Sequence, residues 1–410
     1  MTFGKMHRNN GEVDLTDLMF SWRAEIKNAM DMFNATNYDG AIAHLEMVEK
    51  MYSKVKSFQQ KKNDKKFDEL FEPLEKVSQN WIEAIKNKNI QKAIDTCNKN
   101  GGGSVICDNG SIKTGTLIIK SNVELCIEAG SKIIGSENLE DYKDLVAPGF
   151  KPGEGIEKSK NALILASFAE NISITGKGEI NGSGLSFYDH KTADANGKFA
   201  KPETQRPRII MFYRCKNILI EDVSFVDSAC WTIWLMQCEN VCIHRIKISG
   251  DKKMRNIDGI DIDACCNVTV SDCIIDTEDD CIAIRSMKNL YDKVSVCENI
   301  TLTNCTLKTQ CNGIRVGCSG DGEIKNCVFS NIVISESTNG IIFQNPKYYL
   351  PDGITIGPDI HDILFDNIII KCFRYPVWLF IEDGIKLKQL SDLTFSNIKI
   401  SYCGGPLLIQ

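Results

Sequence analysis

Hydrophobic and polar positions along the chain follow two different periods. Between residues 14 and 85, apolar residues recur at spacings of three and four in segments rich in Ala, Glu, Lys and Met, which predicts amphipathic helices. A polar stretch at residues 59–66 predicts a loop between two parts that could form a helical hairpin. A last helix is predicted at residues 90–97. We interpret the helical residues 14–85 as a packing or capping appendage, with a partner-binding module as the alternative.

From residue 104 onward the period changes to two. Short β-branched runs are broken by Gly, Asn, Asp and Ser, and one unit recurs: an Asn or Asp, an alternating apolar run and a polar turn. Copies begin at Asn171, Asn217, Asn240, Asn267, Asn299, Asp362 and Asp392. Adjacent copies are about two to three dozen residues apart, the length of one solenoid repeat. Because helical segments between the strands are missing and hairpin signals are sparse, the pattern predicts an all-β solenoid of stacked parallel coils.

The 18 cysteines fit the interior of such a solenoid. Cys273, Cys305 and Cys327 each follow a strand run, which predicts that they occupy one phase of successive coils and form a buried ladder. The chain is long and has no CxxC pair of the zinc type, so we expect reduced thiols that behave as small hydrophobes.

Length and charge limit the domain organisation and the classes of binding partner. The 410 residues fit two parts, a helical segment at 1–88 and the solenoid at 89–410. The net charge of −6 argues against nucleic-acid binding, and because no apolar run approaches the ~18 residues of a spanning helix, no membrane partner is predicted. The start of the chain lacks an apolar signal region, so we expect a cytoplasmic protein, or an extracellular one if the N-terminus is a gene-model artefact. Oligomeric state is not predicted.

One interval concentrates polar residues at predicted turns. Asp258 lies at a Gly-containing turn, and Asp279 and Asp280 follow 21 and 22 residues later, about one coil. Since neighbouring strands are ~4.8 Å apart, the three carboxylates are expected to be neighbours. Gathered carboxylates raise at least one pKa, and glycosidic cleavage needs a protonated acid together with an ionised base. Acidic turn residues also bind calcium or cap backbone amides, so both interpretations stand at this point.

Two motifs in this interval resemble those of the polygalacturonase family of glycoside hydrolases. NIDGID at residues 256–261 is similar to the family's Asn-Thr-Asp-Gly motif, and DDCIAIRS at residues 279–286 is similar to its Asp-Asp motif. Segments at residues 115–136, 171–184 and 206–241 are similar to coils of bacterial members. The resemblance covers residues 89 to 410 and implies a right-handed, single-stranded parallel β-helix that hydrolyses glycosidic bonds with inversion.

The resemblance also implies roles for individual residues. Asp279 would be the general acid, and Asp258 with Asp280 would activate the water. Asn256 would orient this centre. Asp261 and Asp263 alternate after the turn; Asp261 is assigned to the cleft, whereas solvated strand surface is the preferred interpretation for Asp263.

Two departures from the family pattern concern specificity. The family's Gly-His-Gly motif aligns with CNGIRVG, which places Asn312 where the family has histidine. Its Arg-Ile-Lys motif, which grips a uronate carboxylate, aligns with NGIIFQ, so Ile342 and Gln344 stand where two cations are expected. Arg285 and Arg315 are the remaining cationic candidates for substrate binding, with a surface arginine as the alternative for each.

Aromatic residues offer one more candidate. Trp231 and Trp234 in CWTIWL could form a platform for a sugar ring, with Trp234 preferred, or could pack in the interior. The five histidines are scattered, and no phosphate loop or Ser-His-Asp order stands out, so neither a metal nor a cofactor is predicted.

The expected function is hydrolysis of O-glycosidic bonds in a pectin-related polysaccharide or oligosaccharide. The alternatives are a catalytically altered carbohydrate-binding β-helix and a related glycosidase that acts on a neutral sugar. The three aspartates favour an enzyme, because packing of a β-helix does not require three carboxylates at one place. The changes at Asn312, Ile342 and Gln344 weaken unmodified polygalacturonate as the expected substrate.

Overall fold

A computed structural model describes residues 24–25, 27–28, 43–44, 46–48 and 90–410, except 109, 152–157, 294–295, 318–321, 348–349, 351–352, 354, 403–407 and 410. Spatial contacts divide the chain into two units, Met1–Lys92 and Ala93–Gln410. The described residues between 24 and 48 are helical, as the period predicts, and the loop predicted at residues 59–66 lies outside the described residues. No helix among the described residues is long and apolar enough to cross a membrane.

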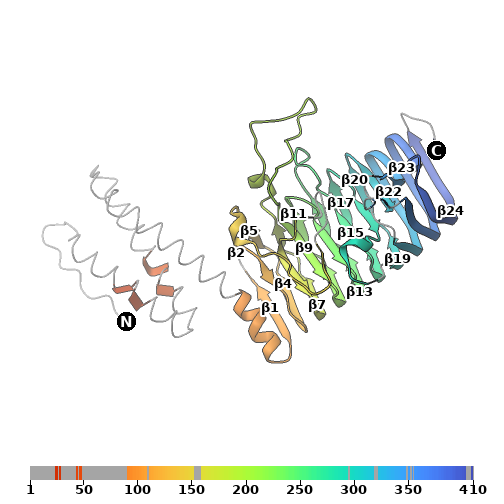
Figure 1. The fold of residues 1–410 in the computed structure, drawn as a ribbon. Coiled ribbons are helices and arrows are strands. Elements are labelled where there is room, and N and C mark those ends of the chain that lie inside the picture. The colour runs from red at the N-terminus through yellow and green to blue at the C-terminus, as the bar shows by residue number, and fades with distance from the viewer. Residues whose placement is uncertain are drawn as a thin grey trace. The chain divides into compact units, whose positions relative to one another are not determined.

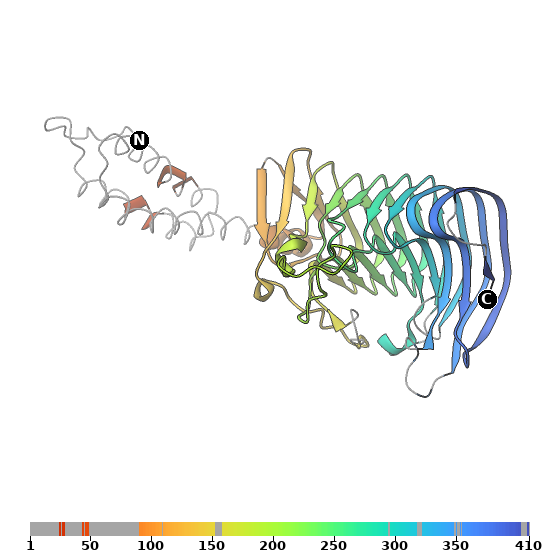
Figure 2. The same ribbon diagram turned by 90° about the horizontal axis from the view of Figure 1, so that it is seen from above.

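Ala93–Gln410 folds as the predicted right-handed parallel β-helix (Figure 1). Its strands form three parallel sheets, and the coils stack one behind another along the solenoid (Figure 2). The first sheet contains β1 (Gly103–Cys107), β4 (Val123–Ile127), β7 (Glu170–Thr175), β10 (Lys216–Glu221), β13 (Glu239–His244), β16 (Cys266–Ser271) and β19 (Val296–Thr303). The second contains β2 (Gly110–Thr114), β5 (Ser131–Gly135), β8 (Glu179–Asn181), β11 (Ser224–Val226), β14 (Lys247–Ser249), β17 (Ile274–Thr277) and β20 (Thr306–Thr309). The third contains β3 (Leu117–Ile118), β6 (Ala162–Ser167), β9 (Arg208–Tyr213), β12 (Ile233–Met236), β15 (Ile260–Asp263), β18 (Ile282–Arg285) and β21 (Asn312–Gly317).

Toward the C-terminus the strands become longer and continue around the corners of the solenoid. β22 (Glu323–Asn345) pairs with β19, β20 and β21, so one strand contributes to all three sheets. β23 (Ile356–Ile381) follows β22 and pairs in turn with β24 (Lys386–Tyr402) and β25 (Leu408–Ile409). The short 3-10 helices are η1 (Leu139–Asp141), η3 (Gly184–Phe187) and η4 (Lys288–Leu290).

The interior of the solenoid is filled by side chains that repeat at one register position. In the third sheet, fully buried isoleucines stack from strand to strand. They are Ile210, Ile233, Ile260, Ile282, Ile314 and Ile341. Each coil leaves its apolar edge uncovered until the next coil stacks on it, so burial is shared between neighbours. Along each strand of this sheet, the residues next to these isoleucines point outward. The functional site lies on this outward face.

The recurring asparagines form a ladder at one corner. Their side chains are hydrogen-bonded in sequence, each Nδ2 donating to the Oδ1 of the asparagine one coil earlier at 2.9–3.3 Å. The members are Asn122, Asn171, Asn217, Asn240, Asn267, Asn299 and Asn326, all with φ between 53° and 62°. Left-handed backbone is tolerated by Asn better than by most other L-residues, which explains why the repeat begins with this residue.

The predicted free, buried thiols are confirmed for Cys273, Cys305 and Cys327, whereas the predicted ladder of these three residues is partly wrong. Cys273 and Cys305 are buried at equivalent positions, directly before the paired residues Ile274 and Thr306. Cys327 instead pairs with Ile300 in the first sheet, because the turn position of that coil comes later along β22. A second buried set stacks at another corner, namely Cys215, Cys238, Cys265 and Cys297. All described cysteines are free thiols.

A helix at residues 90–99 precedes the first coil, close to the predicted 90–97. Ile94 on this helix is fully buried, and the Asn98 side chain donates a hydrogen bond to the Ser121 carbonyl at 2.9 Å. Asp95 forms an ion pair with Lys120 at 2.7 Å. These contacts attach the helix to the turn before β4. The packing or capping role of residues 14–85 stays a prediction.

Candidate active site

The three predicted aspartates meet on the third sheet. Asp258 lies just before β15, and Asp279 and Asp280 lie just before β18, the next strand of the sheet. The Gly259 N–H donates to the Asp280 carbonyl at 2.8 Å, which sets the two turns side by side. A Cβ atom at Gly259 would lie 2.3 Å from the Cys281 carbonyl oxygen, so the close stacking of these turns requires glycine.

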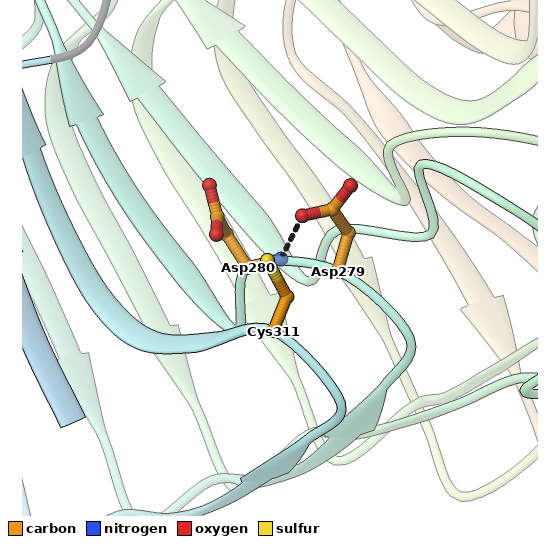
Figure 3. A group of neighbouring side chains, drawn as sticks. All are labelled: Asp279, Asp280 and Cys311. Atoms are coloured by element: carbon orange, nitrogen blue, oxygen red, sulfur yellow. Dashed lines mark hydrogen bonds between the residues drawn. The ribbon is translucent and has the colours of Figure 1, made fainter. Parts of the chain in front are cut away.

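Asp279 is the most accessible of the three carboxylates. The backbone N–H of Asp280 donates to Asp279 Oδ1 at 3.0 Å. Figure 3 shows the Asp279 and Asp280 side chains next to each other at the turn. Asn256 Nδ2 lies 3.4 Å from Asp279 Oδ2, and its Oδ1 accepts a hydrogen bond from Arg206 at 3.2 Å. The structure thus places Asn256 beside Asp279, and its orienting role stays a prediction. Asp279 is partly exposed, whereas Asp258 and Asp280 are 2% and 0% exposed.

Asp280 is held by two partners from the following coil. Asn312 Nδ2 donates to Asp280 Oδ1 at 2.5 Å, and Arg315 Nη1 lies 3.1 Å from Asp280 Oδ2. Arg315 also donates to Gln344 Oε1 at 2.9 Å. The structure therefore brings three predicted binding residues together around one carboxylate. The alternative of a surface arginine is wrong for Arg315, because its guanidinium is buried against these groups.

Asp258 and Asp261 share Arg285. Its Nη2 atom lies 2.9 Å from Asp261 Oδ1 and 3.5 Å from Asp258 Oδ2. The Arg285 guanidinium also lies over the Trp231 ring, 4.1 Å from its centroid. Asp261 and Arg285 are 0% and 3% exposed, so the surface alternative for Arg285 is also wrong. Asp258 Oδ1 is buried without a hydrogen-bond partner among the described residues.

Asp263 is not solvated strand surface. It is fully buried, its Oδ2 accepts a hydrogen bond from the Tyr291 hydroxyl at 2.7 Å, and its Oδ1 accepts one from the Met287 N–H at 3.0 Å. The alternation of β15 places Asp263 outward as expected, but a later segment of the chain covers it. Asp263 thus anchors that segment.

One outward register position runs through the whole site and is here called the central row. Its members are Met211, Trp234, Asp261, Ala283, Arg315, Ile342 and Trp378, one from each successive strand. Asp261 and Arg315 bracket the centre of the row, at the level of the catalytic turns. The two ends of the row differ, because one is buried under other segments and the other is partly open.

The N-terminal end of the central row is buried under a cover formed by two segments, 145–151 and 287–292. Phe150 and Tyr291 form an antiparallel bridge, and Lys151 N–H donates to the Leu290 carbonyl at 2.9 Å. The apolar side chains of the cover pack on outward residues of β6, β9 and β12. Cover residues in this cluster are Leu145, Ala147, Phe150, Met287, Leu290 and Tyr291.

The cover explains why the prediction for Trp234 is wrong. Trp234 is fully buried and Trp231 is 2% exposed, so neither offers a free ring face. Their rings pack edge to face at 5.2 Å, with Phe150 6.4 Å from Trp234. Arg208 lies over the Trp234 ring, 4.4 Å from its centroid. Packing, the alternative that the sequence left open, is the observed role of both tryptophans.

Comparisons with known proteins agree with this arrangement. A sequence model described as "Glycosyl hydrolases family 28" matches residues 149–299 and 289–409, more than half of the chain. The chain belongs to glycosyl hydrolases family 28. It is 24% identical to an endo-polygalacturonase of Pectobacterium carotovorum subsp. carotovorum over 320 residues, covering 75% of this chain and 76% of that protein. It is also 37% identical to a probable polygalacturonase of Arabidopsis thaliana over 142 residues, covering 35% of this chain and only 28% of that protein.

A solved structure shows the same fold. The polygalacturonase from Erwinia carotovora ssp. carotovora superimposes with a TM-score of 0.63 at 20% sequence identity, covering 79% of this chain and 92% of that chain. The resemblance inferred from NIDGID and the Asp-Asp motif is therefore confirmed at the level of family and fold. The chain is a family 28 glycoside hydrolase that resembles polygalacturonases.

Within this family 28 site, burial and neighbouring charges shift the pKa values of the carboxyl groups. Burial, followed by the charges of Asp279, Asp261 and Asp280, raises the pKa of Asp258 well above its usual value. Burial raises the pKa of Asp261 to about 7, although Arg285 opposes the shift. Burial and the Asp280 charge likewise raise the pKa of Asp279, against smaller lowering by the hydrogen bond with Cys311 and by Arg315. The surroundings thus favour the protonated forms of Asp258, Asp261 and Asp279.

Cys311 is a site residue that sequence reasoning missed. The ligand atoms of Asp279, Asp280 and Cys311 lie within 4.8 Å of one another (Figure 3). Burial, and then the two carboxylates, raise the pKa of the Cys311 thiol well above its usual value, so it stays protonated and is a poor metal ligand. The sequence did contain a signal for this residue, because Cys311 directly precedes Asn312 in the segment aligned with the family's Gly-His-Gly motif.

Proposed function

We propose that the chain hydrolyses O-glycosidic bonds of a pectin-related polysaccharide or oligosaccharide by inversion. The observation that carries this proposal is the convergence of Asp258, Asp279 and Asp280 from adjacent turns onto one outward face. One of them is partly exposed with a raised pKa, and another is contacted by two donors. Hydrolysis with inversion uses one protonated and one ionised carboxyl group.

Asp279 fits the role of general acid. Its raised pKa keeps a proton available, and its partial exposure gives a glycosidic oxygen access to it. In the proposed step, Asp279 transfers its proton to the leaving oxygen while the bond between that oxygen and the anomeric carbon breaks. A water molecule attacks the anomeric carbon from the opposite face, and its proton passes to the base.

Asp280 fits the role of that base better than Asp258. Both oxygens of Asp280 accept from donors, Asn312 and Arg315, and a carboxylate satisfies both. Burial raises the pKa of Asp258 well above its usual value, so its carboxyl group already carries a proton and cannot accept another. Its Oδ1 atom is buried and lacks a partner among the described residues, and in this proposal that atom binds the attacking water. Asp258 then positions the water and Asp280 accepts the proton.

A binding-only protein is the second candidate, and one observation favours it. Asp258 and Asp280 are almost entirely buried, so a water and a sugar must enter a tight space for catalysis.

The pectin-related substrate of the first proposal is supported by the relatives, since proteins that match this chain are named polygalacturonases.

The deciding experiment is release of reducing ends from polygalacturonate, methyl-esterified pectin and neutral plant glycans. The parent protein is expected to act on at least one of them, and Asp279→Asn is expected to lower the rate by roughly 10²–10⁴-fold. Asp108→Asn, at an exposed position that directly follows β1 in the first coil, is the matched control and should retain the parent rate. Equal rates for Asp279→Asn and the parent would contradict the mechanism, and the anomer seen first by NMR tests inversion.

A further inference from the structure

The C-terminal end of the central row carries a cluster of partly exposed aromatic rings on β23. Trp378 and Tyr375 have ring centroids 5.0 Å apart, and Trp378 and Phe380 are 5.4 Å apart, with tilts of 35° and 39°. All three side chains are partly exposed, in contrast to the buried Trp231 and Trp234 at the other end. We call Tyr375, Trp378 and Phe380 the β23 platform.

The platform continues the face that holds the carboxylates. Asp280 is hydrogen-bonded to Asn312, Asn312 Oδ1 accepts from Asn339 at 2.8 Å, and Asn339 is the register partner of Tyr375. In the central row, Trp378 lies two strands beyond Arg315, roughly 10 Å at the usual strand spacing. A saccharide bound at the carboxylates and extended along the solenoid therefore reaches the platform within a few sugar rings.

Among the described residues, the register positions next to the platform on β22 carry the uncharged side chains of Ile342 and Gln344. Ile342 is the register partner of Trp378, and Gln344 is the register partner of Phe380. Arg315, the register partner of Ile342 on the other side, is already committed to Asp280 and to Gln344. A buried isoleucine beside an indole ring favours an uncharged group over an anion, because an unpaired carboxylate placed there would lose hydration.

We propose that the β23 platform is a sugar subsite for an uncharged pyranose ring, with Trp378 as its principal contact. This proposal rests on the proposed function for its orientation relative to the carboxylates. Aromatic faces pack against the C–H face of a sugar and bury apolar area without needing a charge. Two kinds of ring share this chemistry, a methyl-esterified uronate and a neutral hexose. Arg374, whose guanidinium lies 4.8 Å from the Tyr375 centroid, is the cation that a rival, carboxylate-binding subsite would use.

The test measures binding by calorimetry on the full chain carrying Asp279→Asn, so that the ligand is not consumed. The probes are unesterified oligogalacturonide, methyl-esterified oligogalacturonide and a neutral galactose oligomer of equal length. The esterified or the neutral probe is expected to bind more tightly than the unesterified one, and which of the two binds best identifies the ring. Trp378→Ala is expected to weaken that binding by about tenfold or more, the effect of losing one buried aromatic contact.

Phe373→Ala is the matched control, because Phe373 lies on the same strand, is 60% exposed and is outside the platform. It should bind like the parent, and Trp378→Phe should retain most of the affinity that Trp378→Ala loses, which separates a ring contact from misfolding. The proposal is overturned if Trp378→Ala binds all probes like the parent. It is equally overturned if the unesterified probe binds most tightly and loses affinity in Arg374→Gln.

Failure of the proposed function gives a different pattern. Loss of affinity in Trp378→Ala without any glycan hydrolysis by the parent protein would remove the catalytic role and retain the subsite. Hydrolysis by the parent with a KM that Trp378→Ala leaves unchanged would retain the catalytic role and remove the subsite.

Discussion

Neighbouring groups act on the Asp279 carboxyl group in opposite directions. The Asp280 charge adds to the effect of burial and raises the Asp279 pKa, whereas the hydrogen bond with Cys311 and then the Arg315 guanidinium lower it. Arg315 thus limits the rise of the Asp279 pKa. It also forms an ion pair with Asp280. A single cation from the following coil therefore acts on both members of the Asp-Asp motif.

Replacing Arg315 is expected to change the pH dependence of the reaction as well as its rate. In the proposed mechanism Asp279 is the general acid and must be protonated, so activity is expected to fall as the pH rises through the pKa of Asp279. Arg315→Gln removes one of the groups that lower this pKa, which should move the alkaline limb of the kcat profile upward by roughly one pH unit while the rate decreases. The pH profile of reducing-end release checks this shift. A lower rate with an unmoved alkaline limb would assign Arg315 a purely structural role.

Asp261 makes the stability of the protein depend on pH. Its pKa is about 7 in the folded protein and about 3.9 in an unfolded chain, so the folded state binds more protons between these values. The stabilisation is complete below pH 4 and is lost as the pH rises through 7. Asp261→Asn should therefore raise Tm at pH 8 by at least about 2 °C relative to the parent and change it little at pH 4.

Thermal unfolding of the parent, Asp261→Asn and the exposed control Asp108→Asn at both pH values measures this difference. Arg285 retains Asp258 as a partner in the Asp261 variant. A larger gain at pH 4 than at pH 8 would show that the sign of the pKa shift is wrong.

At the scale of the elements, the asparagine ladder combines two separable contributions. Asn267 has φ of 58°, donates to Asn240 and accepts from Asn299. Asn267→Gly loses the hydrogen bonds but keeps the backbone conformation accessible, whereas Asn267→Ala also adds left-handed strain of about 1–2 kcal/mol. The alanine variant should therefore be the less stable of the two by about that amount. Denaturant unfolding compares them, and equal stabilities would mean that the ladder acts through hydrogen bonds alone.

The strands and the carboxylate centre could be predicted from the sequence because both depend on local period. Alternation places Asp261 and Asp263 on the same outward face, and a spacing of one coil brings Asp258 beside Asp280. The environment of that face could not be predicted in this way. Burial of Asp263 and Trp234 comes from residues 145–151 and 287–292, which meet across more than a hundred positions of sequence. Solvation of a strand residue depends on such distant segments, and period alone carries no information about them.

Across the whole molecule, the two ends of the central row predict the mode of cleavage. The cover buries Met211 and Trp234 on one side of the carboxylates, whereas Trp378 is partly open on the other. A long polymer cannot extend over the covered side, so cleavage is expected near a chain end. Reducing ends should accumulate with little loss of viscosity, and one short product should dominate from the first minutes. Early release of oligosaccharides of many intermediate lengths would contradict closure by the cover.

Each coil contributes one residue to the central row. This has a consequence for how the sugar preference of such a protein can change during evolution. The carboxylates belong to the coils of β15 and β18, and the β23 platform belongs to a coil that makes no contribution to them. Exchange of the later coil for one from a relative would replace the proposed sugar subsite and leave the three aspartates in place. The junction between the coils of β22 and β23 carries an amide pair of its own, in which Asn367 donates to Asn331 Oδ1 at 2.7 Å, so an exchanged coil with asparagine at this position could form the same contact. New sugar preferences can then arise by recombination of whole coils rather than by redesign of a pocket.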